Sequence, residues 1–560
     1  MAHQKSEQQK TEQQKLEHQE TGSKKSFWEQ LNYKAFIPGA ACLVAIIVAG
    51  VAAPDSFGAA LTAIHGFLMD HFKWVYILVV VVIVALFLFI LFSKYGNIRL
   101  GGKNAKPSIS KFSWFCLTMT STIAVGICFY GVAGPVNMFM NPPEFLGVEA
   151  GTQEAIIPVL EYCYLHYSLP PYFIILTLAL AISLVHYNGR RSLRASDTLF
   201  PLLGKRSEGI IGTLANTLQV ICLLVCGTNM GLAVIQLGSG VSTVSGAGNA
   251  TDYYIPIIIF YTVLTCIHAT SGVHKLMGKV SNINAVGYFF ILLFIAIVGP
   301  AGLNRLLGLL FTSVGQFVQD FIPMTTFADP IYETGWQDYM TIYYYAWNIA
   351  PAMIHALFYV SLAYGRTLRE FVVYNCLLPA GVNCIWYTVF GGTAMLSILN
   401  GSDLYQVIQQ FGDGISTFAF LDMFPAGDFL KWFFIVLAVL TFLTFSDGVA
   451  FSFPMLLMKK TELDVSKTHA PKILNIVVAV FMGVLTTILL YVGGYDALCE
   501  CMVVVAFPVA ILLLFVCFSI FKFIFHRETY DMTYREEQAL DQEKATGGEA
   551  VAKDTLTENP

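Results

Sequence analysis

An aromatic run in the second half of the sequence offers the clearest binding chemistry in this chain. Tyr343 and Trp347 are four residues apart, so they would share one face of a helix, and Tyr344 and Asn348 would share the neighbouring face. Pro351 follows and would interrupt the backbone hydrogen bonds of that helix. Carbonyls freed in this way inside a membrane are tolerated only beside other protein or a water-filled cavity. The run therefore predicts a binding-site wall, and a packed aromatic face is the alternative that spacing alone leaves open.

The elements that would position this wall are apolar helices. The chain has 560 residues, of which 56% are hydrophobic and 12% charged, whereas soluble domains carry about 25% charged residues. A membrane span needs about 20 apolar residues. Twelve runs meet this need, at residues 34–53, 72–93, 112–139, 171–187, 210–237, 253–270, 282–303, 337–364, 371–398, 428–457, 471–494 and 498–525.

Charged residues in the loops test this count. If both ends of the chain are cytoplasmic, alternate loops should hold the Lys and Arg residues. All of these residues except Lys73, Arg305 and Lys431 fall in the tails or in alternate loops, whereas the opposite loops are acidic. The pattern predicts an all-α membrane protein with twelve spans and both termini inside, and an amphipathic segment, 305–321, along the outer surface.

The predicted organisation has three parts. A polar cytoplasmic tail, 1–33, precedes a twelve-helix domain, 34–525, and an acidic cytoplasmic tail, 526–560, follows it. The sequence contains no Walker loop, HExxH or GxSxG pattern, which argues against an enzyme. Its 12 Cys are scattered, many inside apolar runs, and are interpreted as small buried hydrophobes rather than metal ligands. We expect no cofactor, no metal and no nucleic-acid partner, which leaves a secondary transporter, a channel or a membrane receptor.

Five segments in order along residues 110–450 resemble one known family. They are Phe129-Tyr130-Gly131 followed by Pro135, Leu199–Gly209, Gly227–Gly240 (GTNMGLAVIQLGSG), the run from Gly335 to Thr393 with its GRTLRE turn and LPAG…W…FGGT helix, and Leu443-Thr444-Phe445-Ser446-Asp447. The ordered set resembles the betaine/choline/carnitine transporter family. The resemblance implies a LeuT-like fold, with two inverted repeats of five helices after two extra N-terminal helices. It also implies a homotrimer and a substrate site near the bilayer midplane, between helices three, four, eight and ten.

The resemblance implies a substrate class as well. Family members enclose a trimethylammonium group in tryptophans and tyrosines, and this cation–π attraction contributes about 2 kcal/mol when desolvated. In this chain Trp347 and Asn348 align with a tryptophan pair, and two tyrosines replace fourth-helix tryptophans. The implied substrate-binding residues are Tyr130, Tyr167, Tyr172, Tyr343, Tyr344, Trp347 and Asn348. Such a site is smaller and more polar, which favours a substrate with an additional hydrogen-bonding group or a less methylated amine.

Ion coupling is a second point at which the chain departs from the family. The adjacent Thr and Ser that hold sodium in coupled members align with Thr444 and Phe445, and a phenyl ring has no oxygen for a hard cation. An arginine and a methionine of sodium-independent exchangers align with Asn284 and His355. His355 is either a satisfied core residue or a proton relay. Asp447 is either a functional carboxylate within the membrane or a group that satisfies a helix end.

These features together predict a multi-pass secondary transporter of a bacterial or archaeal inner membrane. It would move a small quaternary-ammonium or related zwitterionic compound by alternating access, through sodium-independent exchange or facilitated transport. A cation-coupled symporter for a different amine or amino-acid-like solute is one alternative, and a transport-like membrane sensor is another. The acidic tail after Arg527 disfavours sensing of anionic membrane lipid and favours a nutrient transporter over an osmotic importer.

Overall fold

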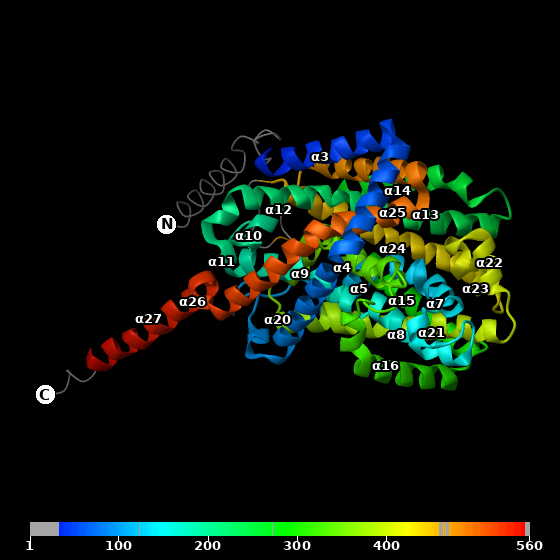
Figure 1. Ribbon diagram of the computed structural model, residues 1–560. Coiled ribbons are helices and arrows are strands. Elements are labelled where there is room, and N and C mark those ends of the chain that lie inside the picture. The colour runs from blue at the N-terminus through cyan, green and yellow to red at the C-terminus, as the bar shows by residue number, and fades with distance from the viewer. Residues whose placement is uncertain are drawn as a thin grey trace, which may run out of the picture.

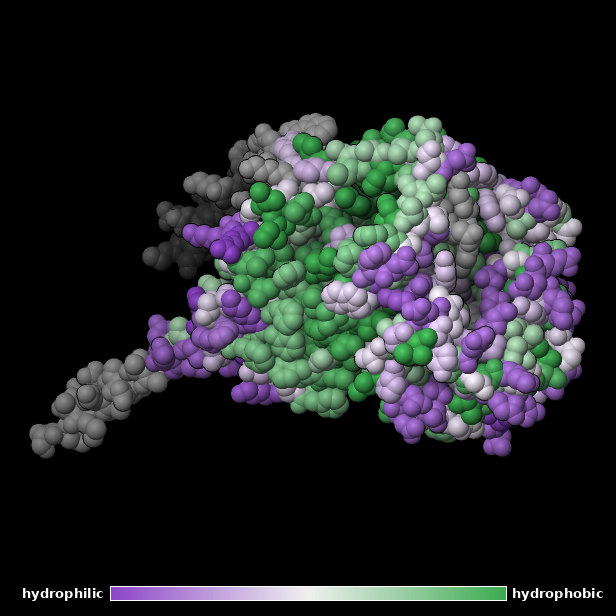
Figure 2. Space-filling model, viewed as in Figure 1, coloured by the Kyte–Doolittle hydropathy of each residue, from purple (hydrophilic) through white to green (hydrophobic). Residues whose placement is uncertain are grey.

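The protein is a bundle of helices with an apolar middle. The structure, a computed structural model, describes residues 33–122, 124–270, 273–458, 463, 465 and 470–554. Figure 1 shows that the start of the first described helix and the C-terminal helix lie at the same end of the bundle. Figure 2 shows an apolar surface over the middle of the molecule, with hydrophilic residues gathered toward its two ends. This banding is what a membrane-embedded helical bundle presents to lipid.

The helices follow the chain in a simple order. The longer ones are α3 (Tyr33–Ala52), α4 (Pro54–Phe92), α5 (Lys111–Thr122), α7 (Tyr130–Met140), α8 (Ile156–Tyr167), α9 (Leu169–Ser183), α12 (Ile210–Ile221), α13 (Leu223–Ser245), α14 (Tyr254–Thr270), α15 (Val273–Val298), α16 (Leu303–Thr326), α18 (Thr341–Ile349), α19 (Ala352–Ala363), α21 (Leu378–Leu399), α24 (Gly427–Leu456), α25 (Lys472–Phe525) and α27 (Met532–Asp554). The shorter helical elements are η1 (Lys94–Asn97), α6 (Ala124–Cys128), η2 (Glu144–Leu146), η3 (Gln153–Ala155), η4 (Leu184–Asn188), α10 (Ala195–Thr198), α11 (Phe200–Leu203), η5 (Gly204–Glu208), η6 (Ala250–Tyr253), α17 (Trp336–Tyr339), α20 (Leu368–Val372), η7 (Val373–Leu377), α22 (Leu404–Phe411), η8 (Asp413–Ile415), α23 (Ser416–Asp422) and α26 (Arg527–Tyr530).

Ten helices in the described part of the chain are long and apolar enough to cross a membrane. The pair Trp336–Ile349 and Ala352–Ala363 makes up to 11, with a bend of 49° between its two parts. This bend lies at Pro351, where the sequence predicts an interruption. The predicted first span is present as a shorter apolar helix, Ile37–Ala52, and α16 counts among the ten. The chain is therefore a multi-pass helical membrane protein.

One predicted boundary was wrong. The predicted helix 171–187 belongs to a longer helical segment that begins at Gln153 and breaks at Ser168, whose φ of −116° and ψ of −112° are not helical. Pro170 and Pro171 follow this break, because proline fits the first turn of a helix but not its interior. The predicted helices 471–494 and 498–525 correspond to two candidate spans, Lys472–Tyr491 and Cys499–Phe525, and both lie within the single helix α25. No proline lies between residues 495 and 497 to end it.

Two glycines allow α7 to approach its neighbours closely. A Cβ at Gly134 would lie 2.9 Å from the hydroxyl of Tyr167, and one at Gly131 would lie 2.6 Å from Nε1 of Trp386. Both distances are shorter than ordinary van der Waals contact. The glycines therefore bring Tyr130, the first residue of α7, into the same layer as the end of α8.

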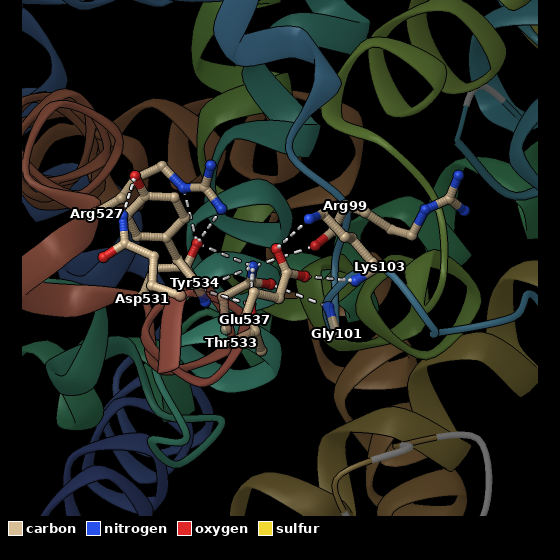
Figure 3. A network of polar contacts seen from close by, with 10 residues as sticks. Arg99, Gly101, Lys103, Arg527, Asp531, Thr533, Tyr534 and Glu537 are labelled. Atoms are coloured by element: carbon tan, nitrogen blue, oxygen red, sulfur yellow. Dashed lines mark hydrogen bonds and ion pairs between the residues drawn. The ribbon is translucent and has the colours of Figure 1, made fainter. Parts of the chain in front are cut away.

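A C-terminal clasp joins the last helices to the loop that carries Arg99 and to the end of η4 (Figure 3). We define it by Asn188, Arg99, Gly101, Asp531 and Thr533. The side-chain amide of Asn188 donates to the carbonyl oxygen of Arg99 at 3.1 Å, to Oγ1 of Thr533 at 3.1 Å and to the Asp531 carboxylate at 3.3 Å. Its oxygen accepts from the backbone N–H of Gly101 at 3.0 Å. Asn188 and Asp531 are both 0% exposed, so the clasp is buried.

The GRTLRE turn forms the other side of this region. Its backbone pairs with the loop that carries Arg99: Leu100 N–H donates to Arg366 O, and Gly365 N–H donates to Leu100 O, both at 2.9 Å. Gly365 has a φ of +77°, and a Cβ there would lie 2.5 Å from the carbonyl carbon of Lys106. This position requires glycine both for its backbone angle and for space. The GRTLRE motif, which carries much of the family resemblance, therefore has a structural role in holding the loop that carries Arg99.

Candidate functional site

Five aromatic side chains from three helical segments meet inside the bundle. We call them the aromatic cluster: Tyr130 begins α7, Tyr167 ends α8, and Tyr343, Tyr344 and Trp347 lie on α18. All five are buried, with Trp347 the most exposed at 8%. Helices end or begin at Phe129 and Ser168, so Tyr130 and Tyr167 lie at helix ends. From there their rings reach α18.

The rings form a continuous set of contacts. Tyr130 lies edge-on to Tyr344 at 5.8 Å and to Trp347 at 5.4 Å between ring centroids. Tyr167 lies 4.8 Å from Tyr344, and Tyr343 is stacked on Trp347 at 6.3 Å. These separations are those of rings packed directly against one another. The spacing at positions 343, 344 and 347 therefore predicted a face that does gather aromatic partners from distant helices.

Hydrogen bonds fix the positions of side chains in the cluster. The hydroxyl of Tyr167 donates to the hydroxyl of Tyr344. The indole N–H of Trp347 donates to Oδ1 of Asn229 at 2.8 Å, from α13. The amide of Asn348 donates to the carbonyl oxygen of Tyr344 at 2.6 Å on its own helix. This bond ties Asn348 to its own helix, and its assignment to the substrate stays a prediction from the family resemblance.

A cavity of about 260 Å³ adjoins the cluster. Tyr130, Tyr343 and Tyr344 line one side of it, and Asp338, Asp413, Glu500 and His65 are among its other lining residues. We call it the acidic cavity. Because the rings of the cluster already touch one another, the open space lies in this cavity beside the three tyrosines rather than between the rings.

The three carboxylates of the acidic cavity differ in their partners. Asp338 is 3.3 Å from Nζ of Lys73, so its charge is balanced. Asp413 accepts from the amide of Asn137 at 2.8 Å, and Glu500 accepts from Oγ1 of Thr62 at 2.9 Å and 3.0 Å. Burial raises the pKa of Asp413 from its ordinary value, and the hydrogen bond from Asn137 opposes this shift. Asp413 and Glu500 thus have neutral hydrogen-bond partners and leave a negative field in the cavity.

One predicted wall residue makes no ring contact with the cluster in the described part of the chain, whereas three unpredicted residues do contact the cluster. Tyr172, on α9, is fully buried, and no ring contact with the cluster is found for it in the described part of the chain. His166 stacks on Tyr344 at 4.6 Å, and Tyr387 stacks on Tyr167 at 4.6 Å. Asn229 belongs to the GTNMG motif, so its position was visible in the sequence, whereas His166 and Tyr387 had no local signal to mark them.

The candidate coupling residues form separate contacts away from the cluster. Thr444 donates to the carbonyl oxygen of Leu440 at 2.9 Å on its own helix. The rings of Phe445 and His355 lie 5.1 Å apart, so the phenyl ring occupies space beside the imidazole. A continuous site with oxygen ligands for sodium is therefore not formed by Thr444 and Phe445.

The remaining two coupling candidates are paired with other groups. Asn284 donates from its amide to Oγ1 of Thr441 at 2.7 Å. Asp447 lies 3.0 Å from Nδ1 of His268, which joins α24 to α14. The Oδ1 oxygen of Asp447 is buried and has no hydrogen-bond partner in the described structure. Asp447 is therefore a half-satisfied carboxyl group inside the bundle.

Comparison with known proteins decides the family. The sequence model of the betaine/carnitine/choline family of transporters matches residues 34–529. The chain belongs to this family. It is 28% identical over 491 residues to a glycine betaine transporter, OpuD, of Bacillus subtilis, covering 86% of this chain and 92% of that protein. It is 27% identical over 477 residues to an osmo-independent choline transporter, BetT1, of Acinetobacter baylyi, covering 84% and 89%.

A further relative extends the range of named solutes. A betaine/ectoine transporter, LcoP, of Corynebacterium glutamicum is 28% identical over 510 residues, covering 88% of this chain and 78% of that protein. Members of the family are transporters, so this protein is a transporter rather than an enzyme. The resemblance inferred from the ordered motifs is confirmed.

Proposed function

We propose that this transporter carries a quaternary-ammonium compound of the betaine, choline or carnitine type by alternating access. The observation that carries the proposal is the acidic cavity lined by Tyr130, Tyr343 and Tyr344. Aromatic faces attract a cation that has no N–H to donate, and the attraction grows where water is excluded. The names of three bacterial relatives mention betaine or choline, and they support the same substrate class.

We further propose the arrangement implied by the family resemblance. It has twelve spans, inverted five-helix repeats of the LeuT type, a homotrimer within membrane lipid, and both termini in the cytoplasm of a bacterial or archaeal cell. The domain bounds remain 1–33, 34–525 and 526–560. Support comes from the basic loops around residues 94–111 and 365–370, which pair with each other near the C-terminal helices.

Uptake into liposomes that contain the purified protein tests the proposal. Labelled choline, glycine betaine and carnitine would be offered with and without a sodium gradient, and with and without unlabelled substrate inside. We expect uptake that internal substrate accelerates and sodium does not, as an exchanger requires. Strict dependence on sodium would contradict the proposed coupling, and failure of every methylated amine to enter would contradict the substrate class.

The ring of Phe445 gives a direct test of coupling. We expect Phe445→Ser to gain stimulation of uptake by sodium, because it replaces a phenyl ring beside Thr444 with a hydroxyl oxygen. Phe445→Ala is the matched control, since it removes the same ring and adds no oxygen. Initial uptake rates with sodium or with N-methylglucamine would be compared. Equal behaviour of the Ser and Ala variants would show that a missing hydroxyl does not explain sodium independence.

A cation-coupled symporter for a different amine is the second candidate, and one observation favours it. The buried contact between His268 and Asp447, at 3.0 Å, joins two titratable groups inside the bundle. Intramembrane carboxyl groups of this kind serve proton coupling in other transporters. Acidification of the liposome interior during substrate uptake, lost in Asp447→Asn, would favour this candidate over exchange.

A further inference from the structure

The residues that line the acidic cavity indicate whether its proposed ligand is a zwitterion or a net cation. Its floor is aromatic, formed by Tyr130, Tyr343 and Tyr344, which suits a methylated ammonium head. Glycine betaine and choline share that head and differ only at the other end, which is a carboxylate in one and a hydroxyl in the other. The groups around the rest of the cavity therefore decide between a zwitterion and a net cation.

Negative charge dominates those groups. Asp413 and Glu500 line the cavity and accept hydrogen bonds from the neutral side chains of Asn137 and Thr62. The nearby base, Lys73, contacts Asp338 and so offsets only that carboxylate. Within the described part of the chain, no lysine or arginine lines the cavity. A substrate carboxylate would lie among fixed carboxylates without a cation to balance it, whereas a net cation would be attracted.

One polar side chain in the cavity is free to meet a hydroxyl. His65, from α4, lines the cavity and is 5% exposed. Its ring lies 5.6 Å from that of Tyr339, and no hydrogen bond from His65 is found among the described residues. Because His65 lines the cavity, a ligand hydroxyl placed there can hydrogen-bond its imidazole ring.

From this geometry we infer that the acidic cavity selects a quaternary-ammonium alcohol, a net cation of the choline class, over a zwitterionic betaine. The methylated head lies against the three tyrosines, Asp413 and Glu500 balance its charge, and His65 hydrogen-bonds the hydroxyl. This assignment rests on the proposed function and narrows it to one charge type. Asp413 and Glu500 are the specificity-determining residues, because they disfavour the carboxylate end of a betaine.

Isothermal titration of the purified, detergent-solubilised transporter tests the assignment with three probes. They are choline, glycine betaine and tetramethylammonium, which has the head but neither a hydroxyl nor a carboxylate. We expect choline to bind at least tenfold more tightly than glycine betaine. In Asp413→Asn the affinity for choline should fall about tenfold. The ratio of the affinity for choline to the affinity for glycine betaine should therefore decrease. Glu500→Gln, a second variant, should change the preference in the same direction.

Two controls separate charge from general damage. Asp403→Asn removes an exposed acidic charge that does not line the cavity, and it should leave the preference unchanged. His65→Phe should weaken choline binding and leave tetramethylammonium binding close to that of the wild type, because only choline has a hydroxyl. Size-exclusion retention would confirm the fold of each variant.

The outcomes are distinct. Equal or tighter binding of glycine betaine by the wild type would overturn the charge assignment while leaving a quaternary-ammonium transporter in place. An unchanged preference in both Asp413→Asn and Glu500→Gln would overturn the role given to these carboxylates. Failure of all three probes to bind would overturn the proposed function and this assignment with it.

Discussion

Replacement of Tyr344 by leucine should weaken the binding of a quaternary-ammonium substrate about thirtyfold. Tyr344 lines the acidic cavity and contacts Tyr130, Tyr167 and Trp347 through its ring. Leucine still fills apolar space but has no π face, and a desolvated cation–π contact is worth about 2 kcal/mol, which corresponds to about thirtyfold in affinity. Titration calorimetry of the variant would measure the change.

Tyr344→Phe is the matched control for this prediction. It keeps the ring and loses only the hydroxyl that accepts from Tyr167. Its affinity should therefore stay much closer to that of the wild type than the affinity of the leucine variant. If leucine and phenylalanine weaken binding equally, the hydroxyl pair rather than the aromatic face is what the substrate requires. An unchanged affinity in Tyr344→Leu would place the cation elsewhere.

The second large effect concerns stability at the C-terminal clasp. Asp531→Ala should lower the free energy of unfolding by about 3 kcal/mol, the lower end for loss of one partner from a buried charged pair. The Asp531 carboxylate accepts from Arg527 at 2.8 Å and 2.9 Å, from the hydroxyl of Thr533 at 2.6 Å and from Tyr534 N–H at 3.1 Å. Its removal also leaves the amide of Asn188 with fewer acceptors inside the protein.

Thermal denaturation of detergent-solubilised protein, followed by fluorescence-detected size exclusion, would measure this loss as a lower midpoint temperature. Asp541→Ala is the matched control, because Asp541 lies ten residues further along the chain on α27 and is exposed. That variant should melt with the wild type. Equal midpoints for the Asp531 and Asp541 variants would show that the clasp adds no stability to the membrane domain.

Local sequence patterns predicted much of this fold. Long apolar runs such as residues 75–92 predict a helix that is stable in a membrane rather than in water. The structure has α4 there. Pro351 predicted the interruption that separates α18 from α19. The start of α8 was missed, because residues 156–167 contain Glu161, His166 and several tyrosines, and their mean apolarity does not resemble that of a lipid-facing run.

The candidate site was predictable only in part. Positions 343 and 347 share one helix face and position 344 lies on the neighbouring face, so their grouping on one helix could be derived from local spacing. The approach of Tyr130 and Tyr167 followed from the family resemblance. Asp413 and Glu500 line the same cavity although many residues separate them in the chain, and no local periodicity encodes such a meeting. Tyr172 is the opposite case. The resemblance implied it as a site residue, but its buried ring makes no ring contact with the cluster in the described part of the chain.

The C-terminal clasp has a consequence for how the protein is made. Asn188 and its acceptor Asp531 are 343 residues apart in the chain, so the ribosome synthesises the first long before the second. Arg99 and Gly101 emerge earlier still. Until translation reaches Asp531 and Thr533, the side chain of Asn188 remains without these two partners. The clasp can therefore form only after residues 531–533 have been made, and a chain that stops before them lacks these buried partners.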